Sequence, residues 1–267
     1  VATVGKMSIP ELRKRNYPEK LLLGSLAGSG TLGLLIPPSI ILIIYGVTVQ
    51  ESIAKLFIAG IIPGIMIAII FMLYVIIWSI INKKEMPTSS EIFSFDDKIK
   101  GLKQLLPVIL LIVAVIGSIY MGIATATEAA SFGVVGALFL SFFQKTLTKE
   151  TFKLSLLGAT KTSCMIAFIL AGSSFLSLAM GFTGLPRNLA ICIQEMNLSP
   201  YVLIFVLTIF YIILGMFLDG ISAVVLTMAI IEPMIRQAGF DMIWFGIFLV
   251  VVVEMAQITP PVGFNLF

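Results

Sequence analysis

Residues 30–39 read GTLGLLIPPS and residues 254–263 read EMAQITPPVG, so a proline pair occurs twice inside apolar sequence. Each pair lies within a run that is long enough to cross a membrane. Because proline removes a backbone donor and clashes with the preceding turn, each pair is predicted to break its helix. Broken backbone at membrane depth is tolerated only where protein or a watery cavity surrounds it. Two such breaks indicate a transported ligand or ion.

The composition is that of an all-α integral membrane protein. Hydrophobic residues make up 59% of the 267 residues and charged residues only 12%, far below the soluble average of about a quarter. The absence of histidine removes imidazole metal sites, Ser-His catalysis and histidine proton relays. The net charge of +3 gives no reason to expect a nucleic acid partner. The two cysteines, Cys164 and Cys192, are expected to be buried, inert thiols.

The apolar runs predict the order of the spans. The first run covers residues 21–47, and four further spans are expected over residues 52–81, 105–123, 125–143 and 154–179. Two shorter runs, 201–217 and 223–235, flank a polar tip at Asp219–Ser222, and the last run covers 242–267. The polar stretch Asn82–Gln104 is predicted to be an exposed loop with an amphipathic portion on the membrane surface.

An ungapped internal repeat relates the two proline pairs. One constant offset along the chain places Pro10 on Pro233, Arg13 on Arg236 and the first proline pair on the second. The second copy is preceded by the two short runs and their polar tip. The first copy is expected to have a matching leg and tip before Val1.

The distribution of lysine and arginine predicts the topology. Arg13–Lys20, Asn82–Gln104 and Lys145–Lys153 carry most of the positive charge and are predicted to be cytoplasmic. An odd number of crossings then separates the two copies of the repeat. If residues 201–235 form a re-entrant hairpin, the copies are inverted, as in many secondary transporters. The alternative is two full spans with a polar turn at the cytoplasmic face.

The breaks and the tip supply the candidate site residues. Carbonyls and hydroxyls at a helix break suit a sodium ion, whereas the amide end of the next half-helix suits an anion. The predicted sodium-binding residues are Gly30, Thr31, Gly33, Pro37, Gly220, Ser222, Thr259 and Gly263. The predicted substrate-binding residues are Asp219, Ser222, Pro260 and Pro261.

Structural roles compete with these functional ones. Proline and glycine in a membrane helix can simply kink it or let helices pack closely. Glu128 either has a function or caps the helix that begins near Thr125. Residues 172–174, Gly-Ser-Ser, either line a pathway or allow close helix packing, and packing is preferred.

The same motifs resemble a known family. GTLGLLIPPS at residues 30–39, GMFLD at 215–219 and TPPVG at 259–263 are similar to the large membrane (M) subunit of tripartite ATP-independent periplasmic (TRAP) transporters. The likeness extends over nearly the whole chain, including TEAA at 127–130 and WFG at 244–246. Several spaced motifs agree in order, which makes the resemblance specific.

The resemblance implies an inverted-repeat secondary transporter in a bacterial inner membrane, with re-entrant hairpins and discontinuous helices. It implies sodium-coupled import of an organic acid, sialic acid first and a C4-dicarboxylate next, through an elevator-type motion. The implied partners are a periplasmic substrate-binding protein and a small membrane (Q) subunit, sometimes fused to this one. Na⁺ is the only cofactor implied.

The predicted organisation has three parts. Residues 1–50 hold the second leg of hairpin 1 and the first broken helix, residues 51–200 are scaffold and connecting helices, and residues 201–267 hold hairpin 2 and the second broken helix. No nucleotide-binding loop is present, so energy is expected from an ion gradient or a partner. The alternatives are an ion channel, or a sodium/anion symporter that works without a binding protein. An enzyme is not expected.

Overall fold

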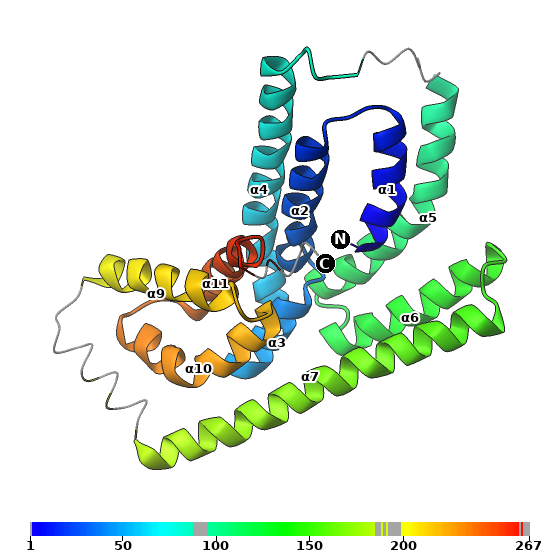
Figure 1. Cartoon of the computed structure of the whole chain (residues 1–267). Coiled ribbons are helices and arrows are strands. Elements are labelled where there is room, and N and C mark those ends of the chain that lie inside the picture. The colour runs from blue at the N-terminus through cyan, green and yellow to red at the C-terminus, as the bar shows by residue number, and fades with distance from the viewer. Residues whose placement is uncertain are drawn as a thin grey trace. The chain divides into compact units, whose positions relative to one another are not determined.

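All regular secondary structure in the described part of the chain is helical. The computed structural model describes residues 2–87, 95–184, 188, 191, 199–261 and 263, and within these ranges it contains α-helices and no strand. The predicted all-α architecture is therefore confirmed. The helices, shown in Figure 1, are α1 (Ala2–Lys14), α2 (Glu19–Leu35), α3 (Ile40–Val49), α4 (Ile53–Ile81), α5 (Phe95–Tyr120), α6 (Ala126–Phe143), α7 (Lys149–Thr183), α9 (Pro200–Gly215), α10 (Gly220–Gln237) and α11 (Met242–Gln257).

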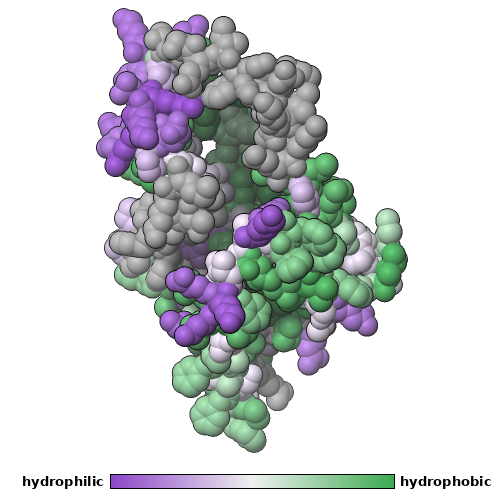
Figure 2. All heavy atoms as spheres, turned by 90° about the vertical axis from the view of Figure 1, so that its right-hand side faces the viewer, coloured by the Kyte–Doolittle hydropathy of each residue, from purple (hydrophilic) through white to green (hydrophobic). Residues whose placement is uncertain are grey.

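Several helices have the length and composition of membrane spans. Among the described residues, five segments qualify: Glu19–Val49, Ile53–Ile81, Ala126–Phe143, Lys149–Thr183 and Gly220–Gln237. Many large apolar side chains on them are exposed, such as Ile62 at 78% and Phe168 at 82%. Figure 2 shows hydrophobic residues over wide areas of one face. A surface of this kind is stable in lipid rather than in water.

Both proline pairs end a helix, as predicted. The first pair separates α2 from α3, and Ser39 is the residue that caps α3. The second pair lies in a turn just after α11 ends at Gln257. The Pro37-Pro38 and Pro260-Pro261 peptide bonds are both cis.

The chain divides into two compact units. One contains Val1–Thr88 and Ile169–Phe267, and the other contains Ser89–Phe168. In the first unit α11 packs against α9, α10, α2, α3 and α4, so it is the central helix of that unit. In the second unit α5 packs against α6.

Two expectations need correction. The stretch Asn82–Gln104 is not a loop throughout, because α5 begins at Phe95 and continues without interruption into the apolar part of the helix. An amphipathic segment that leads into an apolar span can extend the same helix, so composition alone misplaced its start. Cys164 is exposed rather than buried, since α7 turns nearly all of its apolar length outward. Cys192 lies outside the described residues.

Candidate functional site

The first helix break is held together by Ser39. Its hydroxyl donates a hydrogen bond to the carbonyl of Leu34 on α2 and accepts one from the amide of Leu42 on α3, at 3.2 Å. The residue is fully buried. Ser39 therefore fixes the end of α2 against the beginning of α3, while the amides of Ile40 and Ile41 begin a helix and have no intrahelical acceptor.

The second element of the site is the turn between α9 and α10. Asp219 is the N-cap of α10, and its Oδ2 accepts hydrogen bonds from the amides of Ile221 and Ser222, both at 3.1 Å. The carboxylate predicted to bind substrate is thus engaged with the backbone of its own helix. This one oxygen compensates two of the amides that a helix start leaves without partners.

A cavity of about 270 Å³ joins these two elements. Its lining comes from both sides of the first break, from the α10 start and from the end of α11: Leu34, Ile40, Ile41, Asp219, Gly220, Ile221 and Gln257. Two helix N-termini, those of α3 and α10, meet at this cavity. The amides of Ile40 and Ile41 at the start of α3 have no intrahelical acceptor and favour an anionic group, whereas Asp219 already accepts from the amides of Ile221 and Ser222 at the start of α10. We refer to this cavity as the tip cavity.

Gln257 is the polar side chain that α11 contributes to the tip cavity. It is only 5% exposed, and no hydrogen bond is found for its amide group within the described part of the chain. A Cβ placed on Gly220 would lie 2.6 Å from its Nε2 and 2.7 Å from Cδ1 of Ile41, so a larger residue there would force these side-chain ends to move. Gln257 stands three residues before its proline pair, as Leu34 does before the first pair.

Sequence reasoning missed both Gln257 and Ser39. A serine directly after a proline pair and before an apolar run is an N-cap pattern, so Ser39 had a readable signal. Gln257 had a weaker one, since an amide in an otherwise apolar helix needs a polar partner. Which cavity it enters depends on the packing of α10, which the sequence does not show.

The predicted site residues are only partly brought together. Asp219 and Gly220 line the tip cavity, whereas the other predicted residues are absent from its lining. Thr31 is buried and donates its hydroxyl proton to the carbonyl of Gly28, at 2.7 Å. Thr259 is half-buried and donates to the carbonyl of Met255, at 2.8 Å. Both hydroxyl oxygens keep lone pairs that can bind a cation.

The remaining predicted residues differ in how accessible they are. Pro37, Gly220 and Gly263 are buried, Gly30 and Ser222 are half-buried, and Gly33, Pro260 and Pro261 are exposed. No atom of the described residues beyond its own helix backbone and chain neighbours lies within 4 Å of a Cβ placed on Gly33, and Gly263 has the positive φ of 63° that favours glycine. Across the described ranges no group of three or more histidine, cysteine or acidic side chains is found.

Glu128 is a helix cap. Its carboxylate accepts from the amide of Thr125 at 2.8 Å, and the Thr125 hydroxyl accepts from the amide of Glu128 at 3.3 Å, which completes a capping box. The residue is exposed. The capping box accounts for a glutamate at this position, so no ligand is needed to explain it.

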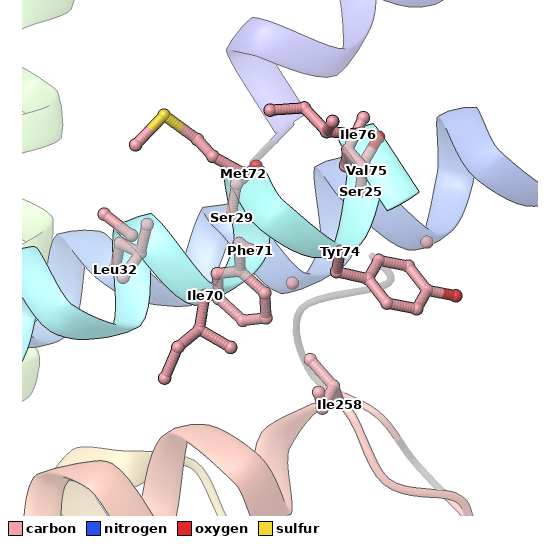
Figure 3. Close-up of a pocket in the computed structure, with 13 residues that line it drawn as sticks. Ser25, Ser29, Leu32, Ile70, Phe71, Met72, Tyr74, Val75, Ile76 and Ile258 are labelled. Carbon is pink, nitrogen blue, oxygen red and sulfur yellow. The ribbon is translucent and has the colours of Figure 1, made fainter. Parts of the chain in front are cut away.

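Two other cavities lie in the first unit. One of about 540 Å³ contains Ser173, whose hydroxyl donates to the carbonyl of Val225 on α10 at 2.7 Å, so this serine joins two helices. The other, of about 660 Å³, is an apolar groove between α2 and α4 (Figure 3). There the Phe71 ring lies 3.4 Å from the position of a Cβ on Gly28, and Ile258 approaches from the chain after α11.

Comparison with known proteins agrees with this architecture. The family model described as "Tripartite ATP-independent periplasmic transporter, DctM component" matches residues 1–267. The C4-dicarboxylate TRAP transporter large permease protein DctM of Pseudomonas aeruginosa is 33% identical over an alignment that covers 100% of this chain and 62% of that protein. The 2,3-diketo-L-gulonate TRAP transporter large permease protein YiaN of Escherichia coli is 33% identical over 98% of this chain and 61% of its own length.

A third relative joins two components in its name. The isethionate TRAP transporter permease protein DctMQ of Oleidesulfovibrio alaskensis is 29% identical over 100% of this chain and 42% of that protein. The chain thus spans about three-fifths of the length of the large permeases that it matches. With a family model that matches it from end to end, the chain belongs to the DctM component family of TRAP transporters, which are transport permeases and not enzymes.

Proposed function

We propose that this chain forms the substrate-translocating part of a TRAP transporter that imports an organic acid across a bacterial inner membrane. The observation that supports this proposal best is the tip cavity, where the N-termini of α3 and α10 meet beside Gln257. Helix N-termini that point at a site near mid-membrane are a common way for a secondary transporter to bind an anionic substrate. The large permease nature of the relatives supports the same function.

The proposed substrate is a small carboxylate or a related organic anion. The names of the relatives refer to C4-dicarboxylates, 2,3-diketo-L-gulonate and isethionate, which are all organic acids. A carboxylate can accept bonds from the amides of Ile40 and Ile41 and from the side-chain amide of Gln257. We propose a C4-dicarboxylate as the first candidate, with sialic acid, which the sequence motifs favour, as the second.

Sodium is the proposed coupling ion. Helix α2 ends at Leu35, so its last carbonyls lack intrahelical donors, and Thr31 and Pro37 lie beside them. Thr259 and Gly263 flank the second break, and Gly220 and Ser222 begin α10. Carbonyl and hydroxyl oxygens of this kind suit a hard monovalent cation.

An elevator-type motion is the proposed mechanism. In it the α9–α10 hairpin, the broken helix α2–α3 and α11 move as one body against the remaining helices. Leu34 and Gln257 stand at matching places before the two proline pairs and line one cavity, which supports an inverted repeat. The division of the chain into residues 1–50, 51–200 and 201–267 belongs to the same proposal.

The proposed partners are a periplasmic substrate-binding protein and a small membrane subunit. The name DctMQ of one relative supports such a subunit, fused in that protein. In this arrangement the chain is multi-pass and Arg13–Lys20, Asn82–Gln104 and Lys145–Lys153 face the cytoplasm.

The test is uptake by the complete permease with its small subunit, reconstituted in liposomes with candidate binding proteins. We expect labelled C4-dicarboxylate or sialic acid to accumulate only when both the binding protein and an inward sodium gradient are present. Uptake that ignores the sodium gradient would contradict the coupling. Electrical current that needs neither substrate nor binding protein would indicate a channel instead.

A further inference from the structure

Glu254 is a buried acidic residue for which the proposed transport cycle has no role so far. It lies on α11, the central helix of its unit, and is only 4% exposed. Its Oε1 is enclosed and has no hydrogen-bond partner in the part of the chain that the structure describes. An ionisable side chain at membrane depth is costly unless it has a function.

Glu254 lies in a buried and mostly apolar stretch of α11. Its helix neighbours Val252, Val253 and Ala256 are buried, and no ion pair to Glu254 is found among the described residues. Two buried titratable groups lie on the helices packed against α11, and both have other partners. The Tyr45 hydroxyl donates to the carbonyl of Met242, and the Tyr211 hydroxyl pairs with Thr227.

The other titratable groups on these helices are at helix ends or exposed. They are Glu19 and Lys20 on α2, Lys55 and Tyr74 on α4, Tyr201 on α9, and Asp219, Glu232 and Arg236 at the two ends of α10. None of them forms a hydrogen bond or ion pair with Glu254 in the described ranges. No cation among the described residues therefore compensates a charge on this carboxylate.

A proton suits this site better than a sodium ion. Sodium needs several oxygen ligands, whereas Val252, Val253 and Ala256, the buried residues next to Glu254 along α11, carry no side-chain oxygen. A carboxylate that takes one proton from solvent becomes a neutral acid, and a neutral acid costs far less to bury than an unpaired charge.

Glu254 is also placed to affect the tip cavity. It lies three residues before Gln257 on α11, and residues with this spacing are neighbours on one face of a helix. Gln257 lines the cavity that favours an anion. A negative charge one turn away would oppose an anionic substrate there, and protonation would remove that repulsion.

We propose that Glu254 is a proton-binding site whose protonation is linked to binding of an anionic substrate in the tip cavity. The proton comes from water at the cavity and is held on the Glu254 carboxyl while the substrate is bound. The link to substrate rests on the proposed transport function, whereas proton binding itself does not.

Infrared difference spectroscopy tests proton binding without requiring transport. The complete permease in lipid vesicles would be titrated from about pH 5 to about pH 8, and the protonated-carboxyl stretching band would be compared between variants. We expect Glu254→Gln to lose a band that the exposed control Glu150→Gln retains. If Glu254→Gln does not fold, Glu254→Asp should shift the band. A band that is unchanged in whichever variant folds would overturn the proposal.

Uptake as a function of pH tests the link to substrate. At a fixed sodium gradient, uptake by the unmodified permease should fall severalfold as pH rises through this range, and Glu254→Gln should flatten the profile. An unchanged profile in Glu254→Gln would overturn the linkage. If the unmodified permease transports nothing, the proposed function fails, while the infrared band still decides whether Glu254 binds a proton.

Discussion

Buried polar side chains gather near the two helix breaks. Thr31, Ser39, Glu254 and Gln257 are each 5% exposed or less, and each lies within six residues of a proline pair. A buried polar group costs free energy unless it has a partner. Ser39 and Thr31 have backbone partners, but Glu254 and Gln257 have none in the described residues. The two that lack protein partners are therefore the ones expected to meet a ligand.

Replacing Gln257 by leucine should weaken substrate binding. We choose leucine because Leu34 occupies the matching position before the first proline pair. A hydrogen bond to a charged group contributes about 1.5–3 kcal/mol, which corresponds to a rise in KM of about tenfold or more. We expect this rise with a smaller change in kcat in liposome uptake. Gln257→Glu should raise KM further because it adds a negative charge. An unchanged KM in both variants would show that Gln257 is not part of the site.

Replacing Ser39 by alanine should destabilise the first break. The substitution removes the N-cap of α3 and the bond to the Leu34 carbonyl. Loss of an N-cap costs about 1 kcal/mol, so the melting temperature in detergent should fall by several degrees. Ser52→Ala is the matched control, because Ser52 caps α4 through a single bond at 3.4 Å. A fall no larger than that of the control would show that the bond across the break is unimportant.

At the residue scale, the sequence predicted which segments form the site better than it predicted the contacts of individual side chains. The proline pairs led to Thr31, and the polar tip led to Asp219 and Gly220, which both line the tip cavity. Asp219 is predicted to bind substrate, and its Oδ2 caps α10; the substrate role stays a prediction. An aspartate can cap a helix or bind a ligand. The sequence is the same in both cases, and only the direction of the side chain distinguishes the two roles.

Glycines set how closely α11 packs against its neighbours. A Cβ on Gly215 of α9 would lie 2.6 Å from the Cβ of Ala256, and a Cβ on Gly246 would lie 2.5 Å from the Tyr45 ring. Both positions leave no room for a side chain. Close helix approach through small residues is how membrane helices gain packing energy in the absence of a hydrophobic driving force.

Gly246→Ala should therefore destabilise the permease. The added methyl group would overlap Cε1 and Cδ1 of Tyr45, whose hydroxyl bonds the Met242 carbonyl at 2.7 Å and holds the ring in place. Overpacking of this kind costs about 1–3 kcal/mol, measurable as a lower melting temperature in detergent. Gly158→Ala is the control, since no atom lies within 4 Å of its Cβ position and alanine is the better helix former. Equal behaviour of the two variants would contradict the packing around Gly246.

Helix breaks were predictable from sequence, and helix starts less so. Proline chemistry alone placed the end of α2 and the turn after α11. The start of α5 at Phe95 was missed because its first residues are charged, and charge does not distinguish a loop from a solvated helix face. The contact of Ser173 with Val225 depends on tertiary packing, which periodicity cannot show.

The first unit brings the beginning and the end of the chain together. Helix α3 packs against α10, and α2 packs against α11. Arg236, near the end of α10, donates to the carbonyl of Val49 at 3.3 Å and pairs with Glu51 at 3.9 Å. Helices α2 and α11, which the predicted internal repeat relates to each other, are thus neighbours in space.

A crosslink across the tip cavity should stop transport. Leu34 on α2 and Ile221 on α10 both line the cavity. Cys164 and Cys192 would first be replaced by serine. Cysteines introduced at positions 34 and 221 should then react with a short bifunctional thiol reagent. The crosslink would fill the cavity and tie the first break to the α10 start, so uptake should be lost and should return when a cleavable reagent is reduced. Each single cysteine, treated in the same way, should retain most of its uptake. Efficient crosslinking with full uptake would mean that substrate does not pass through the tip cavity.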